Sequence, residues 1–115
     1  MSNVMKFEGK IIRWVDGDTV DVMVDLGFRM FSQQRFRLRG VNAPETGKPG
    51  SDEALAVVNR MCPAGSSLSV TCRGHDPYGR WIADIPVTFK SESDVKFDLT
   101  VNEVLLKKGL ALPYP

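Results

Sequence analysis

Short runs of β-branched and aromatic residues, separated by turn residues, fill positions 10–38 of the chain. In the middle run, apolar and polar positions alternate with a period of two, which is typical of a strand with one face against a core. The apolar positions are Val20, Val22 and Val24, and the positions expected to face water are Asp21, Met23 and Asp25. Three consecutive antiparallel strands are predicted here.

Two glycine-containing segments, Asp16-Gly17-Asp18 and Leu26-Gly27, separate these runs. Glycine permits the backbone conformations of tight reversals, so both segments are expected to be turns. The first turn would deliver Asp18 to the edge of the second strand. A loop rich in proline and glycine follows at residues 40–50.

Two further segments carry helix signals. The first begins at Ser51, expected to act as a cap, with acidic residues in its first turn, and its apolar residues keep helical spacing until Pro63. The second has a capping box formed by Thr100 and Glu103 and is expected to end at Gly109.

The remaining extended patterns lie at residues 68–71 and 80–87, with a turn between them at 76–79. Five strands with a helix between the third and fourth predict a five-stranded Greek-key barrel, the OB-fold, in a mainly β (α+β) protein with two helices. Residues 1–115 are long enough for one such domain and too short for two.

Composition narrows the range of partners. The chain has 15 Lys and Arg against 14 Asp and Glu, a formal net charge of +1, so a site for a polyanion must be local. Cys62 and Cys72 are interpreted as free core thiols, although a bond between them stays open. The chain starts without the apolar stretch of a signal peptide, and no run approaches the roughly 20 apolar residues of a membrane helix. A cytoplasmic or otherwise soluble protein is expected, without a membrane or an obligate protein partner.

Candidate chemistry rests on two arginines and one glutamate. Arg37, Glu45 and Arg80 each lie at the end of a predicted strand or in the adjoining loop, where closure of the barrel can bring them together. Guanidinium groups match the oxygens of a phosphodiester in its pentacoordinate state and stay charged at any working pH. A carboxylate beside that phosphate can orient or deprotonate the attacking water.

A divalent cation would screen the carboxylate from the phosphate. Asp18 offers a carboxylate oxygen, Asn42 an amide oxygen and Ala43 a backbone carbonyl, all of them hard ligands of the kind that Ca²⁺ takes. Water and substrate would complete the coordination shell.

Four segments, VDGDTV, RFRLRGVNAPET, DPYGR and VNEVLLKKGLA, resemble the micrococcal nuclease (thermonuclease, staphylococcal nuclease-like) family in order and spacing. The resemblance covers residues 10–112, nearly the whole chain. It implies calcium-dependent hydrolysis of DNA and RNA that leaves 3′-phosphates. Arg37, Glu45 and Arg80 match the family's catalytic positions. Asp18, Asn42 and the Ala43 carbonyl match its calcium positions, and Tyr78 matches a position that contacts a terminal phosphate of the substrate.

Three departures from the family pattern matter. Asn42 stands where better-known members carry aspartate, so weaker calcium binding is expected from the lost charge. Pro77 replaces a basic neighbour of Tyr78. The family's C-terminal helix is expected to be absent, because the sequence ends at Pro115.

Taken singly, most of these residues also have a structural interpretation. Arg35 and Arg39 alternate with Arg37 and would form a solvated basic face. His75 is expected to be an exposed loop residue. Trp14, Phe36 and Trp81 are expected in the core, although OB-fold proteins also use aromatics to stack bases.

Three function classes follow, and the first is the calcium-dependent nuclease. The second is a non-catalytic OB-fold module that binds single-stranded nucleic acid, favoured by Asn42 and the near-neutral charge. The third is an assembly domain that acts through protein contacts. Its only support is the polar insert at residues 90–96.

Overall fold

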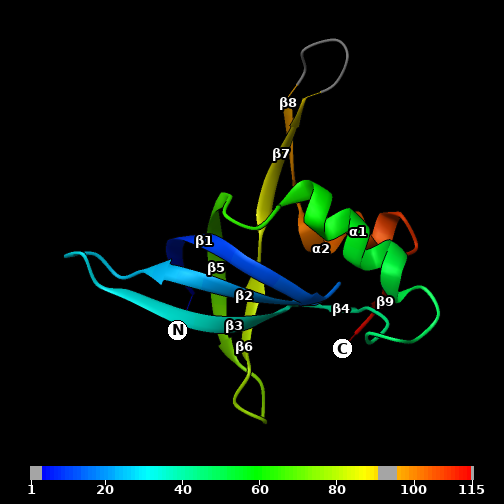
Figure 1. Cartoon of the computed structure of the whole chain (residues 1–115), viewed down its shortest axis with the longest axis horizontal. Helices are drawn as coiled ribbons and strands as arrows, with labels where there is room; N and C mark the ends of the chain where they lie inside the picture. Colours follow the sequence, from blue (N-terminus) through cyan, green and yellow to red (C-terminus); the bar gives the residue numbers. More distant parts are fainter. Residues whose placement is uncertain (1–3, 91–95, 115) are drawn as a thin grey trace.

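The computed structural model describes residues 4–90 and 96–114. Five strands form a closed barrel in the order β1-β2-β3-β6-β5, which confirms the predicted five-stranded OB-type fold (Figure 1). Consecutive strands pair antiparallel, whereas β3 and β6 pair in parallel. The strands are β1 (Met5–Asp16), β2 (Thr19–Asp25), β3 (Phe31–Leu38), β5 (Ser67–His75) and β6 (Trp81–Asp84).

The alternation of β2 builds the core as predicted, with one exception. Val20, Val22 and Val24 are buried, and Trp14 and Phe36 join them in the same apolar cluster. Asp21 was expected to face water but is only 5% exposed. Its carboxylate accepts hydrogen bonds from arginines on β1 and β3, and these bonds replace the water that the alternation alone predicts.

Both predicted helices are present. Helix α1 (Ser51–Met61) begins after Gly50, which is the N-cap residue in a left-handed conformation, so Ser51 is the first helical residue and not the cap. Helix α2 (Val101–Lys107) has the predicted capping box between Thr100 and Glu103. The described residues contain these two helices, and neither is long and apolar enough to cross a membrane.

Gly17 was expected to be required by the backbone conformation of a tight turn, but the structure indicates that close packing requires it. A Cβ atom at this position would lie 2.9 Å from the Ala54 side chain of α1 and 3.1 Å from that of Ala43. The backbone of Gly17 is not in the left-handed region, so a turn conformation does not demand glycine. Close packing of helix α1 against the first turn demands it instead.

Two small sheets complete the fold and were not predicted. The strands β4 (Val41–Asn42) and β9 (Leu112–Pro113) pair beside the barrel. The strands β7 (Pro86–Lys90) and β8 (Lys96–Thr100) form a hairpin that projects away from the barrel (Figure 1). Most of the polar insert noted at residues 90–96, namely residues 91–95, lies outside the described residues.

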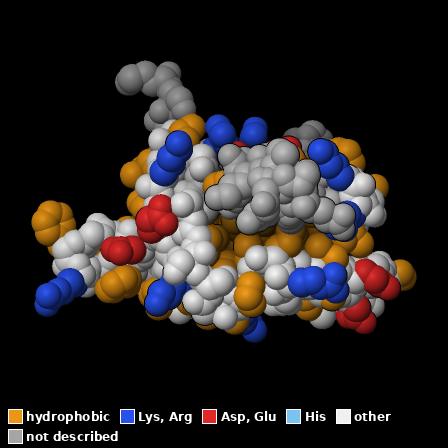
Figure 2. All heavy atoms as spheres, turned by 90° about the horizontal axis from the view of Figure 1, so that it is seen from above, with side chains coloured by type: hydrophobic (Ala, Val, Ile, Leu, Met, Phe, Trp, Pro, Cys, Tyr) orange, Lys and Arg blue, Asp and Glu red, His pale blue; other side chains and the backbone are white. Residues whose placement is uncertain are grey.

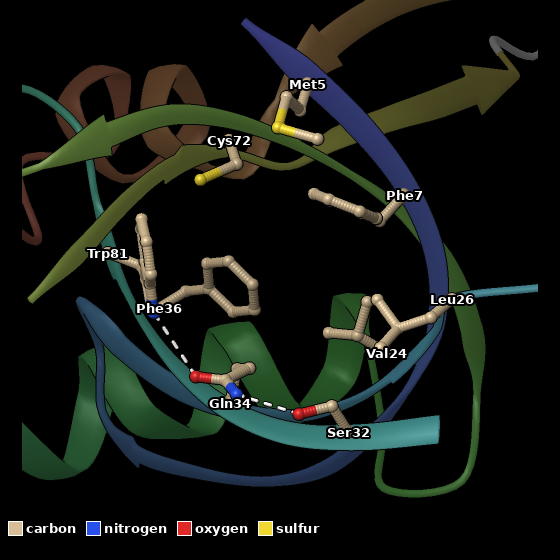
Figure 3. A pocket seen from close by; sticks show the side chains of 9 residues that line it. All are labelled: Met5, Phe7, Val24, Leu26, Ser32, Gln34, Phe36, Cys72 and Trp81. Atoms are coloured by element: carbon tan, nitrogen blue, oxygen red, sulfur yellow. Dashed lines mark hydrogen bonds between the residues drawn. The ribbon is translucent and has the colours of Figure 1, made fainter. Parts of the chain in front are cut away.

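One end of the barrel holds an apolar pocket of about 220 Å³. Side chains from β1, β2, β3, β5 and β6 surround it (Figure 3). Trp81 lines its rim and is 39% exposed, so the expectation that it belongs to the core is wrong. Its indole Nε1 donates to Gln34 Oε1 at 3.2 Å, which holds the ring at the rim.

The turn between β2 and β3 carries backbone strain. Gly27 has the positive φ expected of a turn glycine, but Phe28 and Arg29 also have positive φ angles, of 55° and 62°. The Phe28 side chain is 97% exposed, so no burial of its ring compensates for the conformation. The left-handed region is unfavourable by roughly 1–2 kcal/mol for residues other than glycine, asparagine and aspartate.

Replacing Phe28 with asparagine is therefore expected to stabilise the protein by about 1 kcal/mol, because asparagine tolerates the left-handed region. A thermal unfolding experiment should show a midpoint roughly 4 °C higher. The control is Met30→Asn, which also removes an exposed apolar side chain of the same turn, 60% exposed, at a residue without positive φ. Equal unfolding midpoints for Phe28→Asn and Met30→Asn would show that the positive φ of Phe28 does not destabilise the protein.

Candidate active site

Arg37, at the end of β3, is the centre of a compact set of polar contacts. Its side chain is 13% exposed. The Nη1 group donates to Asp18 Oδ2 at 3.1 Å, and Nη2 donates to the Val41 carbonyl at 3.2 Å and to Asn42 Oδ1 at 3.3 Å. The ring of Tyr114 covers the guanidinium at 4.9 Å from its centroid. The arginine is therefore held on several sides and cannot swing freely.

Asp18 is almost fully buried, with 3% of its surface exposed. Besides Arg37, the backbone N–H of Ala43 donates to Oδ2 at 2.9 Å and the Thr19 hydroxyl donates to Oδ1 at 2.9 Å. The first turn thus places Asp18 as predicted, at the edge of β2 and against the loop that follows β4. These three donors, one of them a guanidinium, offset the cost of removing the carboxylate from water.

The three predicted calcium positions are neighbours in space. Asp18 Oδ2 and Asn42 Oδ1 bond the same guanidinium, and the backbone of Ala43 bonds Asp18. Within the described residues, no group of three or more His, Cys, Asp or Glu side chains could hold a metal ion. The set has one carboxylate and otherwise neutral oxygens, which fits a hard cation in kind but supplies little negative charge.

Arg80 lies at the start of β6, after a turn that Asp76 organises. The Asp76 carboxylate accepts from the backbone N–H groups of Tyr78 and Arg80 and from Arg80 Nε. Partial desolvation alone would raise the pKa of Asp76, but the hydrogen bonds from Arg80 and Tyr78 outweigh it and lower that pKa. The Tyr78 ring, which is 83% exposed, lies under the Arg80 guanidinium at 5.4 Å.

Arg37 and Arg80 line one groove, together with Tyr78, His75 and Tyr114. The parallel pairing of β3 with β6, which sets Arg37 opposite Ile82, brings them together across 43 residues of sequence. Tyr114 was not among the predicted site residues. No spacing pattern marks it, because only the pairing of β4 with β9 carries the end of the chain to Arg37. His75 is exposed as predicted.

Glu45 lies in the exposed loop between β4 and α1. Its carbonyl accepts from the Lys48 N–H at 2.9 Å. Among the described contacts, none joins its carboxylate to Arg37 or Arg80, and Glu45 is not part of the groove lining. Only Ala43 and Pro44 separate it from Asn42, so the Cα atoms of Asn42 and Glu45 are at most about 11 Å apart.

Two buried aspartates hold further arginines beside Arg37. Asp21 accepts from Arg13 and Arg35, and Asp84, which is 8% exposed, accepts from Arg39 and Arg73. Arg35 and Arg39 were expected to form a solvated basic face, but each pairs with a buried aspartate. Basic and acidic side chains form small separate groups on the face of Figure 2, in keeping with the near-neutral net charge.

The hydrogen bond from Arg35 lowers the pKa of Asp21. A lowered pKa means that the charged carboxylate stabilises the fold above the pKa of the unfolded chain, and that this contribution disappears as pH falls through the folded-state value. Asp21→Asn is expected to reduce the free energy of unfolding by about 2 kcal/mol at pH 7.

The unfolding free energies of the Asp21→Asn variant and the wild type, measured in urea, should therefore approach each other as pH falls below about 4, the ordinary pKa of an aspartate. They should converge only at the lower pH where the folded wild-type carboxyl also becomes neutral. The matched control is Asp52→Asn on the exposed first turn of α1, for which a loss below about 1 kcal/mol is expected at pH 7. A difference between Asp21→Asn and wild type that does not depend on pH would contradict the assignment.

Comparison with known proteins agrees with this geometry. Residues 35–115 match the family described as staphylococcal nuclease homologue. The chain belongs to this family. The match begins at the strand that carries Arg37 and includes Glu45, Arg80 and helix α2, so it contains most of the candidate site.

Some relatives of this family member are named as nucleases. A staphylococcal-like nuclease of Arabidopsis thaliana is 37% identical over 101 residues, which is 76% of this chain and 27% of the plant protein. A micrococcal nuclease of Shigella flexneri is 26% identical over 94% of this chain and 59% of its own length. The chain thus spans about a quarter to three fifths of the relatives that it matches.

Proposed function

We propose that this family member is a nuclease that hydrolyses phosphodiester bonds of DNA, RNA or both. The observation that carries the proposal is the groove that Arg37 and Arg80 both line, with Arg37 bonded to the oxygens of Asp18 and Asn42. Two fixed guanidinium groups suit the negative charge that develops on phosphate oxygens in the transition state. The names of the relatives support the same reaction.

Each residue has a distinct role in this proposal. Arg37 and Arg80 bind the scissile phosphate and stabilise its transition state. Glu45 orients or deprotonates the attacking water, and its exposed loop leaves the carboxylate free to turn toward a bound substrate. Tyr78 contacts a terminal phosphate of the substrate from the wall of the groove.

Calcium is the proposed cofactor. Asp18, Asn42 and the Ala43 carbonyl would hold it, and a bound calcium ion supplies positive charge that attracts the phosphate and polarises water. The buried Asp18 carboxylate is the strongest of these ligands, and in this structure it pairs with Arg37. Hydrogen bonds hold the Asp18 carboxylate directly beside the guanidinium of Arg37, which lines the groove.

The direct test is incubation with denatured DNA and with RNA, in calcium and in chelator. Cleavage in calcium that stops in chelator supports the proposal, and restored cleavage after calcium is added back excludes damage by the chelator. Intact nucleic acid under all calcium concentrations would refute it. Salt-dependent binding without cleavage would instead identify the second candidate, a binding module, which the separation of Glu45 from the groove lining favours.

Restoring a second carboxylate should strengthen the cation site. Asn42→Asp is expected to lower the calcium concentration that gives half-maximal cleavage by about tenfold, because calcium affinity rises with the number of charged ligands. Titration of cleavage rate against free calcium measures the shift. Asn59→Asp, an exposed amide on α1, is the control and should leave the titration unchanged.

A further inference from the structure

Arg37 is the middle one of three arginines at alternate positions of one extended segment. Arg35 and Arg37 belong to β3, and Arg39 follows directly, with its N–H still bonded to the Ala83 carbonyl of β6 at 2.8 Å. Alternate residues of a strand project from the same face and are about 6.7 Å apart. That spacing is of the order of the separation of consecutive phosphates along one nucleic acid strand.

The groups on either side of Arg37 carry excess positive charge. On one side, Asp21 is shared by Arg35 and Arg13, and on the other, Asp84 is shared by Arg39 and Arg73. One carboxylate neutralises one guanidinium, so each cluster keeps a net charge of +1. Arg37, in contrast, has Asp18 to itself among the described ion pairs and is neutralised.

The hydrogen bonds within the clusters leave donors for a ligand. Arg13, Arg39 and Arg73 use Nε toward the buried aspartates, and Arg35 uses Nε and Nη2. In the described part of the chain, no hydrogen bond is recorded for the Nη1 group of any of the four. Their side chains are 39–65% exposed while the aspartates beneath are buried. Fixed guanidinium forks with free outer edges suit phosphate oxygens.

The surface is continuous on the Arg39 side. Arg39 and Gly40 line both the groove of Arg37 and Arg80 and a neighbouring hollow that contains Arg73 and Asp84. A strand that leaves the groove past Arg39 thus enters the hollow that Arg73 lines, together with the acidic residues Asp84 and Glu103. The pKa of Asp21 is lowered, in agreement with a carboxylate that stays charged under its two arginines.

We propose that the Arg13–Arg35 and Arg39–Arg73 clusters bind the phosphates on either side of the scissile phosphodiester. The preferred substrate is then a single strand that continues past Arg37 in both directions, and cleavage is internal. The inference rests on the proposed nuclease function for the position of the scissile bond. It goes further in assigning two phosphate subsites and a dependence on substrate length.

The alternative is that the four arginines serve only to neutralise two buried aspartates. The duplication of arginines allows the two roles to be separated. When one arginine of a pair is replaced, the other still bonds the carboxylate, so the fold should survive Arg35→Gln or Arg39→Gln. Thermal unfolding of each variant checks this point before any functional measurement.

Binding is measured by fluorescence anisotropy of a labelled single-stranded oligonucleotide, in chelator, as a function of salt concentration. Arg39→Gln is expected to weaken binding about tenfold and to lower the slope of log K against log salt by about 0.7, the value of one lost contact to a single-strand phosphate. Arg60→Gln in the last turn of α1 removes an exposed arginine elsewhere and should leave the slope unchanged. Equal slopes for Arg39→Gln, Arg35→Gln and Arg60→Gln would overturn the proposal.

The rate of cleavage provides the second readout. The reference substrate is a dinucleotide, which has one phosphodiester. The other two substrates are the same dinucleotide extended by a few nucleotides at its 5′ end or at its 3′ end. The wild type should cleave both extended substrates with higher kcat/KM. The advantage is the ratio of kcat/KM for an extended substrate to kcat/KM for the dinucleotide. Arg39→Gln should lower this ratio about tenfold for one of the two extensions, and Arg35→Gln should lower it about tenfold for the other. Equal advantages in the variants and the wild type would refute the subsites. If no substrate is cleaved at all, the nuclease function fails, whereas the salt slopes still decide whether the clusters bind phosphates.

Discussion

Replacing Arg37 with alanine is expected to lower the rate of phosphodiester cleavage by a factor of about 10² to 10³, and Arg80→Ala should have an effect of the same size. Both residues line the groove, and in the proposed reaction each would stabilise charge that develops only in the transition state. A loss of this kind lowers kcat and kcat/KM together, which steady-state kinetics on denatured DNA can measure. Near-normal rates in either variant would refute its catalytic role.

A structural effect of the Arg37 substitution has to be separated from the catalytic one, because Arg37 also neutralises the buried Asp18. Arg37→Lys makes the separation. Lysine keeps a positive charge beside Asp18 but lacks the planar fork that bonds two oxygens at once. If Arg37→Lys keeps the wild-type unfolding midpoint and still loses most of the rate, the loss belongs to catalysis. Arg60 lies in the last turn of α1 and does not line the groove. Arg60→Ala therefore tests for a general effect of lost positive charge and should keep the wild-type rate.

The predicted barrel was accurate because its signals are local. Alternation in β2, the turn at Gly27 and the capping box of α2 each depend on a few neighbouring residues, and the structure shows all three. The family motifs likewise identified the groove residues Arg37, Arg80 and Tyr78, which lie together in the structure. Features of this kind can be predicted without coordinates, because they depend on neighbouring residues or on motifs whose order and spacing match the family.

The missed features depend on contacts between distant segments. Asp21 is buried because arginines from β1 and β3 close over it, and period-two alternation contains no information about those partners. Trp81 remains at the rim because the barrel end is open at the apolar pocket. Tyr114 reaches Arg37 through the pairing of two-residue strands, which are too short to leave a sequence pattern.

Asn102 is a further residue to which the sequence assigned no role, although it belongs to the motif VNEVLLKKGLA. It lies in the first turn of α2 and is 4% exposed. Its Nδ2 donates to the carbonyls of Arg39 and Ala83, at 2.8 and 3.2 Å, and its Oδ1 accepts from the N–H of Ile85 at 3.4 Å. One amide side chain thus joins α2 to the segment that follows β3 and to β6. Arg37 belongs to β3, and Arg80 directly precedes β6.

Asn102→Ala should therefore lower the free energy of unfolding by about 3 kcal/mol, because it removes the amide that bonds the Ile85 N–H and the Arg39 carbonyl. The Ala83 carbonyl loses one of two bonds and still accepts from the Arg39 N–H. The unfolding midpoint should fall by roughly 10 °C, measured by calorimetry. Asn59→Ala removes an exposed amide that bonds only within α1 and should change the midpoint little. A small effect of Asn102→Ala would mean that water replaces the amide, and that the packing of Val101 and Leu105 alone holds the helix against the barrel. A large effect that also displaces the backbone of Arg39 would connect the stability of α2 to the geometry of the groove.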